Sequence, residues 1–128
     1  MHDPQGDPVR AMWVAYREGD VEAALPLLDP DVEFVTSDGQ VLRGAEEVRR
    51  FFRGFEERGE RFSAQPYSFE RHGDCWIVVG NRRIRTEAGT SDERLYFVHV
   101  VRDGVIVRLA AYPTRERALR ALRALEPS

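Results

Sequence analysis

Lysine is absent from this sequence of 128 residues, and all 19 basic side chains belong to arginine. Without lysine the chain cannot form a Schiff base with a carbonyl compound, and it has no P-loop lysine for a nucleotide. Cysteine is nearly absent too, and the single Cys75 excludes an internal disulfide and a multi-cysteine metal cluster. We therefore expect a protein of a reducing compartment, the cytoplasm.

Long hydrophobic runs are also missing. No stretch approaches the roughly 18 apolar residues of a membrane span, and the first residues lack the pattern of a signal peptide. The formal net charge of −3 offers no basic excess for nucleic acid. His2, His72 and His99 lie on separate predicted elements without metal-ligand spacing. We therefore expect no membrane or nucleic acid as partner, and no metal or other cofactor.

The hydrophobic pattern predicts one α+β domain over residues 1–128. Apolar residues recur at helical spacing after Asp7-Pro8 and after Asp20, predicting helices over about 8–18 and 21–28. A third helix follows Gly44, and Thr114 caps a fourth over 115–125. Apolar residues alternate with a period of two in the segments that we predict as strands, which are 32–36, 62–71, 75–86, 94–102 and 105–112. Helices followed by consecutive strands are typical of α+β folds.

The predicted strand 94–102 is apolar on both faces. Its odd-numbered residues, such as Phe97 and His99, form one face, and its even-numbered residues form the other. A sheet that helices cover on one side only would normally carry polar residues on the other side. We therefore expect a homodimer in which a second subunit covers the outer face. The residues expected there are Trp76, Val78, Tyr96, Val98 and Val100.

Three segments of the chain carry a family resemblance. They are DPDVEFV, RGAEEVRRFF and YFVHVVRDGVIVRLAAY. Gly19-Asp20 follows the first predicted helix, Arg43-Gly44 precedes the third, and Asp103-Gly104 lies between the last two strands. In this order they resemble the SnoaL-like group of the nuclear transport factor 2-like superfamily, whose relatives include ketosteroid isomerases and limonene epoxide hydrolases. The resemblance covers about Val9 to Leu125. It implies a cone-shaped, curved antiparallel sheet wrapped around the N-terminal helices, a deep hydrophobic pocket, a C-terminal helix and commonly a homodimer.

The resemblance also suggests catalytic residues. His99 falls where ketosteroid isomerases carry the protonated aspartic acid of their oxyanion hole, so it is a candidate hydrogen-bond donor or acid–base group. Thr36 occupies the position of their catalytic aspartate, which leaves Asp38 as the candidate base if its turn folds over the pocket mouth. The isomerases' first-helix tyrosine corresponds to Met12 or to Tyr16, depending on the alignment. The alternatives without a catalytic role are that His99 is a core histidine hydrogen-bonded within the protein, and that Asp38-Gly39 is an ordinary turn.

The cone also predicts which side chains line the pocket. These are Met12, Trp13, Phe34, Thr36, Phe52, Phe55, Val79, Asn81, Arg83, Phe97 and Leu109. The strand residues among them follow from a five-residue hairpin loop that pairs Thr86 with Asp92 and places Val79 opposite His99. A slip of one residue would turn Arg83 outward and Arg82 inward. In the last hairpin we expect a three-residue turn with Gly104 as a bulge, which turns Arg108 outward.

Two classes of function remain open. One is a cofactor-free isomerase or polyketide cyclase-like enzyme that binds a hydrophobic carbonyl compound, with His99, Tyr16 and Asp38 as its catalytic groups. The other is a pocket protein that binds a small apolar ligand without turnover, or a dimerisation module whose cavity is filled by phenylalanines. Epoxide hydrolysis ranks low because the pattern does not show two buried aspartates. The residues do not identify the ligand.

Overall fold

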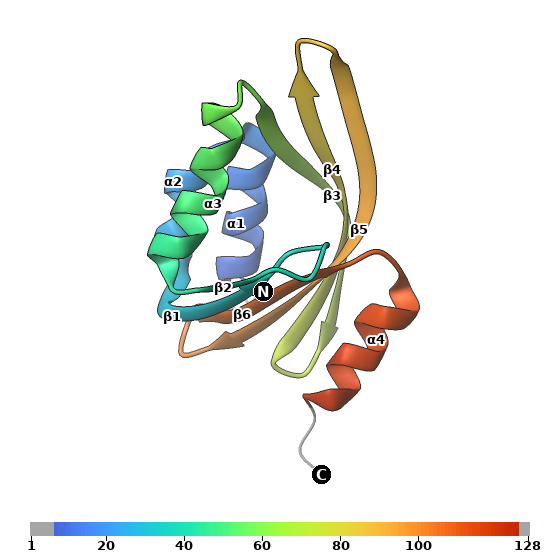
Figure 1. Cartoon of the computed structure of the whole chain (residues 1–128). Coiled ribbons are helices and arrows are strands. Elements are labelled where there is room, and N and C mark those ends of the chain that lie inside the picture. The colour runs from blue at the N-terminus through green and yellow to red at the C-terminus, as the bar shows by residue number, and fades with distance from the viewer. Residues whose placement is uncertain (1–6, 126–128) are drawn as a thin grey trace.

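The computed structural model describes residues 7–125, and it combines four α-helices with a six-stranded sheet (Figure 1). The helices are α1 (Asp7–Glu18), α2 (Val21–Ala24), α3 (Ala45–Glu57) and α4 (Arg115–Ala124), with a 3₁₀ turn, η1 (Leu25–Leu27). The strands are β1 (Leu28–Val35), β2 (Val41–Arg43), β3 (Arg61–His72), β4 (Cys75–Thr86), β5 (Gly89–Arg102) and β6 (Val105–Tyr112). The second predicted helix is shorter than expected, since the chain passes into η1 at Pro26 and then into β1.

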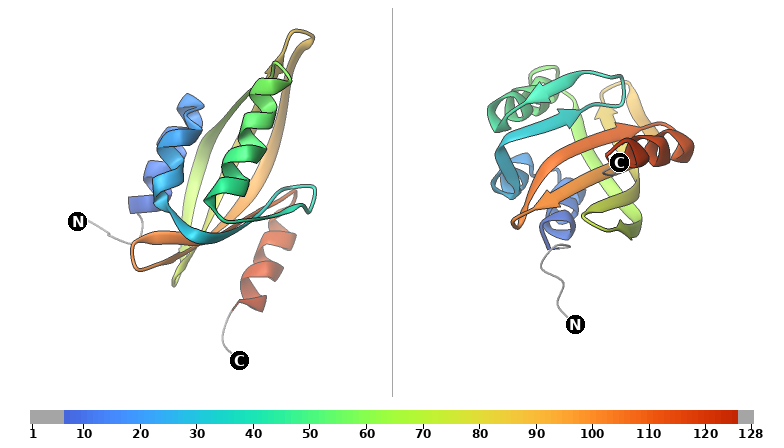
Figure 2. Two further views of the ribbon diagram at one scale, coloured as in Figure 1. Left: turned by 60° about the vertical axis from the view of Figure 1, so that its left-hand side comes forward. Right: turned by 90° about the horizontal axis from the view of Figure 1, so that it is seen from below.

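The sheet has the strand order β2-β1-β6-β5-β4-β3. It curves around α1 and α3, whereas α4 lies on its other side (Figures 1 and 2). This confirms the α+β cone, with one correction to the expectation of an antiparallel sheet. β1 runs parallel to β6, with Phe34 beside Leu109. A parallel neighbour needs a long crossover, and the whole chain from β2 to β5 provides it.

Four apolar residues explain why α1 lies in the hollow of the sheet. Val9, Met12, Trp13 and Tyr16 recur along one side of the helix, and all four are buried. The helix ends where Gly19 adopts a positive φ of 70°. The predicted stripe of α1 is therefore confirmed, and it brings two large aromatic rings into the concave interior.

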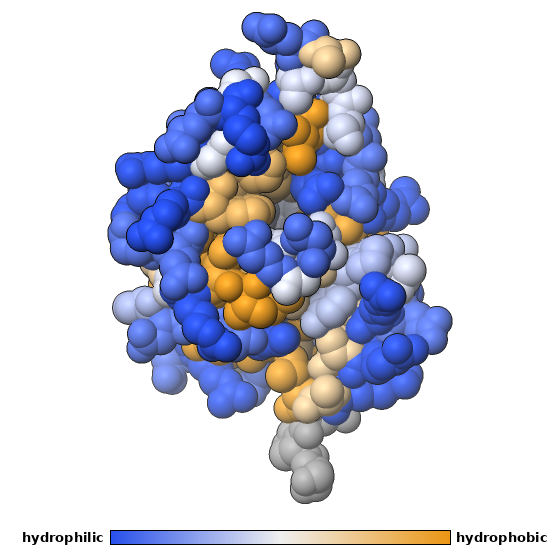
Figure 3. Space-filling model, viewed as in Figure 1, coloured by the Kyte–Doolittle hydropathy of each residue, from blue (hydrophilic) through white to orange (hydrophobic). Residues whose placement is uncertain are grey.

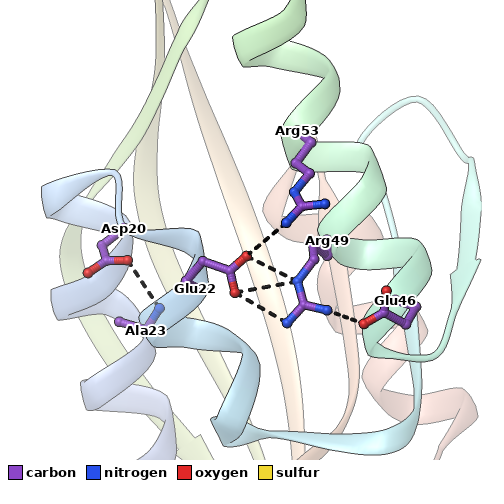
Figure 4. Close-up of polar contacts among 6 residues, drawn as sticks. All are labelled: Asp20, Glu22, Ala23, Glu46, Arg49 and Arg53. Atoms are coloured by element: carbon purple, nitrogen blue, oxygen red, sulfur yellow. Dashed lines mark hydrogen bonds and ion pairs between the residues drawn. The ribbon is translucent and has the colours of Figure 1, made fainter.

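Ion pairs tie α2 to α3 (Figure 4). The Glu22 carboxylate accepts hydrogen bonds from Arg49, at 3.0 Å from Nε and 3.2 Å from Nη2, and lies 3.7 Å from Arg53. Arg49 also donates to Glu46. Asp20 caps α2 by accepting a hydrogen bond from the amide of Ala23 at 3.1 Å, as the sequence predicts. These contacts set the position of α3 over the concave face.

The β4–β5 hairpin is tighter than expected, which reverses the faces of β4. Thr86 pairs with Gly89 instead of Asp92, and Trp76 instead of Val79 lies opposite His99. The Thr86 hydroxyl accepts a hydrogen bond from the Ala88 amide at 3.2 Å, and Gly89 adopts a φ of 143°. A shift of three residues is odd, so it exchanges the two faces of the strand. Trp76 and Val78 therefore face the concave interior, and the prediction that they form an outer dimer surface is wrong.

The last hairpin reaches the expected facing by a different route. Asp103 and Gly104 form a two-residue turn with φ values of 52° and 79°, as a type I′ turn requires. A bulge then interrupts the β5–β6 pairing between Val100 and Val101, so that Val100 lies opposite Arg108. Leu109 consequently lies opposite His99 on the concave face, and Arg108 turns outward and donates to Glu33 at 3.2 Å.

The outer face of the sheet is covered by the chain's own last helix. Ala118 and Leu122 of α4 are buried against Ile77 of β4 and Val98 of β5. The apolar outer face thus has a cover within the subunit, and the inference that a second subunit must provide it is wrong. A homodimer stays a prediction.

Candidate functional site

Aromatic rings fill the concave interior of the cone. Trp13 lies edge-on to Tyr16 and to Phe97, with ring centroids 5.4 and 4.8 Å apart. Phe34 packs edge-on against Phe52 at 5.9 Å. Such edge-to-face pairs are favourable beyond the area that they bury. The predicted pocket residues Met12, Trp13, Phe34, Phe97 and Leu109 do face the interior, as core residues that pack on one another.

His99 lies in the middle of this apolar interior. The indole nitrogen of Trp13 donates a hydrogen bond to its Nε2 at 3.0 Å, and both side chains are almost completely buried. Because an indole N–H can only donate, Nε2 must carry a lone pair, and the proton of the neutral imidazole is on Nδ1. Nδ1 is buried and has no partner among the described residues. The site therefore holds an unused N–H donor surrounded by apolar side chains.

Burial lowers the pKa of His99 from 6.5 to about 3. Removal from water penalises the imidazolium ion, and no described carboxylate offsets that cost. The side chain is therefore neutral at physiological pH. Its available chemistry is donation of a hydrogen bond from Nδ1, and proton transfer as an imidazolium acid is disfavoured.

The low pKa of His99 predicts a loss of stability in mild acid. In the unfolded chain His99 binds a proton near pH 6.5, and in the folded chain only near pH 3. The stability that depends on the neutral imidazole is therefore complete above pH 6.5, and the free energy of unfolding falls as the pH is lowered from 6.5 toward 3. The slope is about 1.4 kcal/mol per pH unit, or about 2 kcal/mol by pH 5.

Urea titrations at pH 7 and pH 5 measure this loss. His99→Gln keeps an acceptor for Trp13 without titrating, so it should lose about 2 kcal/mol less than the wild-type protein between the two values. Val14→Ala, which removes no titratable group from a position of α1 that is 46% exposed, should lose as much as the wild type does. Equal losses in wild type and His99→Gln would contradict a neutral buried imidazole.

The hydroxyl group of Tyr16 is the second unused polar group in the interior. Both Met12 and Tyr16 are buried, so the two alternatives for the first helix share the same environment. The Tyr16 hydroxyl has no hydrogen-bond partner among the described residues, and burial raises its pKa above the ordinary value of 10.0. It stays protonated and can donate a hydrogen bond. Its ring lies 6.1 Å from Phe52 and 5.7 Å from Phe62.

Asp38 lies outside this interior, in the turn between β1 and β2. The buried hydroxyl of Thr36 donates to its carboxylate, and this bond is the main cause that lowers the pKa of Asp38. Asp38 is exposed and borders a pocket of about 520 Å³ between the turn and α4. His99 does not line that pocket. The structure therefore does not bring the candidate base and the candidate donor together in one described cavity.

An open cleft of about 710 Å³ lies where α1 and α3 end and β3 begins. The predicted residues Phe52 and Phe55 line it together with Phe62, and Arg83 lies on its rim. Volumes of this order are typical of small-molecule sites. Since Phe52 and Phe62 also contact the Tyr16 ring, one layer of aromatic side chains separates the cleft from Tyr16. The ring contacts continue from Tyr16 to Trp13 and from Trp13 to His99, so His99 lies deeper.

Three predictions on β4 are wrong. Val79, Asn81 and Arg83 project from the outer face, and Asn81 and Arg83 both donate to Asp92, at 3.0 and 2.8 Å. Arg83 still reaches the cleft rim around the edge of the sheet. The cause is the tight hairpin, which the residue types between Thr86 and Asp92 do not determine.

The concave face carries Gly80 and Arg82 instead. A Cβ atom on Gly80 would lie only 2.7 Å from the indole of Trp13, so the helix packs directly on the strand backbone here. Arg82 donates to Ser37 at 3.1 Å and to Glu93 at 2.5 Å. A register slipped by one residue, which the sequence also allowed, would have predicted that Arg82 faces inward.

Two further features bear on the kind of site. Within residues 7–125, no three His, Cys, Asp or Glu side chains are grouped to hold a metal ion. None of the helices in this part of the chain is long and apolar enough to cross a membrane. Among residues 8–125, the buried polar residues are Thr36 and His99, beside the buried hydroxyl group of Tyr16.

Comparisons with known proteins add family and fold. Residues 9–109 match the model of the SnoaL-like domain, whereas a comparison with curated proteins found no match. An NTF2-like protein of unknown function from Burkholderia pseudomallei is 22% identical, with coverage of 93% of this chain and 97% of that chain and a TM-score of 0.74. An LEH-like epoxide hydrolase from M. tuberculosis is 17% identical, with coverage of 95% and 94% and a TM-score of 0.74. A candidate polyketide cyclase from Pseudomonas putida is 18% identical, with coverage of 93% and 98% and a TM-score of 0.75. At identities this low, the TM-scores establish a common fold and nothing about function.

Proposed function

Because this chain belongs to the SnoaL-like domain family, we propose that it binds a small hydrophobic molecule carrying a carbonyl-type oxygen. The observation that carries the proposal is the buried Nδ1–H of His99, which Trp13 holds in the donor tautomer and which has no described partner. A buried donor without a partner costs about 1–3 kcal/mol. A ligand oxygen that accepts this hydrogen bond recovers that free energy.

The cleft beside α3 supplies a route to the donors. Phe62 is only partly buried and contacts the rings of Tyr16 and Phe52. We propose that the apolar body of the ligand lies on the phenylalanines of the cleft and displaces the Phe62 ring. Its oxygen then accepts from the hydroxyl of Tyr16 or, further in beyond the Trp13 ring, from Nδ1 of His99.

Binding without turnover is the function that these groups support best. Catalysis of the isomerase or cyclase type needs a base next to the ligand, and Asp38 borders a different pocket. Its lowered pKa also makes it a weak base. The alternative is a cofactor-free isomerase or polyketide cyclase-like enzyme in which movement of the turn brings Asp38 to the ligand. Epoxide hydrolysis is disfavoured because no aspartate of the described residues is buried.

The wider context of this function is also a proposal. We place the protein in the cytoplasm as a single domain over residues 1–128, and we propose a homodimer through the outer face of the sheet. Tyr96, Val98 and Val100 face that side, and α4 covers Val98.

A pair of probes that differ in one oxygen tests the proposed binding. Acetophenone and ethylbenzene share a phenyl ring, and only acetophenone has a carbonyl group. Each is titrated against ¹⁵N-labelled protein, with the Trp13 indole N–H resonance as the reporter. We expect the ratio of the two Kd values to shift by roughly 2- to 10-fold toward ethylbenzene in His99→Leu, because the Nδ1–H donor is lost.

The matched control is His72→Leu, the same substitution at an exposed histidine, which should leave the ratio unchanged. Failure of both probes to shift the Trp13 resonance would contradict binding in the interior. An unchanged ratio in His99→Leu would remove His99 from the proposed role.

A further inference from the structure

The turn between β1 and β2, residues 36–40, is a compact unit held by its own hydrogen bonds. The amide of Thr36 donates to the carbonyl of Gln40 at 2.9 Å, and the amide of Gly39 donates to the carbonyl of Thr36 at 3.0 Å. The amide of Gln40 donates to the Thr36 hydroxyl at 3.0 Å. A turn with this many internal bonds keeps its shape when it moves, so its position depends on the contacts at its outer sides.

One of those contacts crosses the concave face of the sheet. Arg82 extends from β4 and donates to the Ser37 hydroxyl at 3.1 Å, while its other nitrogen is held by Glu93 of β5 at 2.5 Å. Figure 1 shows the turn in front of the sheet, reaching toward β3 and β4. In the space-filling view, hydrophobic residues gather between α3 and the sheet around a small group of hydrophilic ones (Figure 3). Arg82 thus holds the turn over an apolar region.

The opposite side of the turn faces empty space and positive charge. The pocket of about 520 Å³ separates Ser37, Asp38 and Gly39 from α4, which contributes Arg117 and Arg120. Arg120 is paired with Glu116 at 2.9 Å, whereas no ion pair is recorded for Arg117 among the described residues. The Asp38 carboxylate is exposed and ionised, since its pKa is lowered. A turn displaced toward α4 therefore has room to move and a cation to meet.

We infer that residues 36–40 form a lid with two positions, which controls a second way for small molecules into the concave interior, beside Arg82 and apart from the cleft at Phe62. In the closed position Ser37 is held by Arg82 of β4. In the open position the Arg82 contact is broken, and the Asp38 carboxylate pairs with Arg117 of α4. Removing the contact that holds one position shifts the equilibrium toward the other position. The entry of a ligand rests on the proposed function, but the motion of the turn does not.

Opposite substitutions on the two sides of the turn test the lid. Arg82→Gln should raise the open-to-closed ratio by about 2- to 10-fold through the loss of one hydrogen bond, and Arg117→Gln should lower it. The readout is the position of the amide resonances of residues 37–39 in ¹H–¹⁵N spectra. The two variants should move these resonances in opposite directions along one line, with the double variant between them.

The control is Arg94→Gln, which replaces an outward-facing arginine of β5 that stacks on the Tyr67 ring and does not touch the turn. It should leave the resonances unmoved. The inferred lid is contradicted if Arg82→Gln leaves the amide resonances of residues 37–39 in place, or if Arg117→Gln moves them in the same direction as Arg82→Gln does.

The association rate of acetophenone, from NMR line shapes, separates the lid from the proposed function. The rate should rise in Arg82→Gln by the same factor as the open-to-closed ratio. If the rate is unchanged while the turn opens, the turn does not control entry and the inference fails. If acetophenone binds to no variant while the resonances move as expected, the proposed binding function fails and the two positions of the turn stand.

Discussion

Replacing Trp13 by alanine is expected to lower the free energy of unfolding by about 3–5 kcal/mol, which is the usual cost of removing a large buried aromatic side chain. Trp13 is almost completely buried and packs on Tyr16, Phe97 and His99. The substitution also leaves Nε2 of His99 without its donor, so that neither ring nitrogen of a buried imidazole has a partner. Both effects act in the same direction.

Urea denaturation at pH 7 followed by circular dichroism measures this loss. Trp13→Phe is the graded variant, because it keeps an aromatic ring and removes the N–H donor, and it should fall between the wild type and Trp13→Ala. Val14→Ala, at the next position of α1 with a side chain 46% exposed, should change stability by no more than about 0.5 kcal/mol. A loss of less than about 1 kcal/mol in Trp13→Ala would contradict the central place of this ring in the core.

Adding a single methyl group at Gly80 is expected to cost about 1–3 kcal/mol, the usual cost of overpacking a core. The added Cβ atom would lie 2.7 and 2.8 Å from two carbons of the Trp13 indole and 3.1 Å from the backbone oxygen of Gln65. Neither neighbour can yield easily, because the indole is enclosed by the core and Gln65 belongs to the paired strand β3. α1 or the β3–β4 hairpin must then shift.

A double-mutant cycle tests the cause of that loss. Trp13→Phe removes the outer ring atoms that the new methyl group would strike, so Gly80→Ala should cost clearly less in the Trp13→Phe background than in the wild type. Thermal denaturation of the four proteins supplies the comparison. Equal costs in both backgrounds would mean that the contact between the strand backbone and the indole does not limit the packing.

The sequence predicted the elements well, because helical and strand periods are local properties. The apolar stripe of α1, the Asp20 cap of α2 and the Thr114 cap of α4 are all confirmed. The burial of His99 followed from alternation within β5, whose odd-numbered residues Leu95, Phe97 and Val101 enter the core with it. The motifs also carried the resemblance to the SnoaL-like group, which the family match confirms.

The site was harder to predict because it depends on register. The loop between Thr86 and Asp92 admits a five-residue or a two-residue hairpin, and an odd difference between the two reverses every side chain of β4. Val79 and Asn81 were therefore placed inside, and Trp76 and Val78 outside, although each of these facings is the reverse of the true one. In the β5–β6 hairpin, a bulge in the pairing restored the expected facing of Leu109.

From its sequence alone, this protein was determined to be an α+β domain with two-sided apolar strands and a histidine inside its core. Only the tertiary structure decided which face of β4 is concave, that α4 covers the outer face, and that aromatic rings fill the cone. Alternation defines two faces of a strand without saying which one is inside, since that depends on hairpin closure and on the elements that pack against the sheet. The partner of Nε2 of His99, Trp13, lies 86 residues away in the chain, and only packing brings the two together.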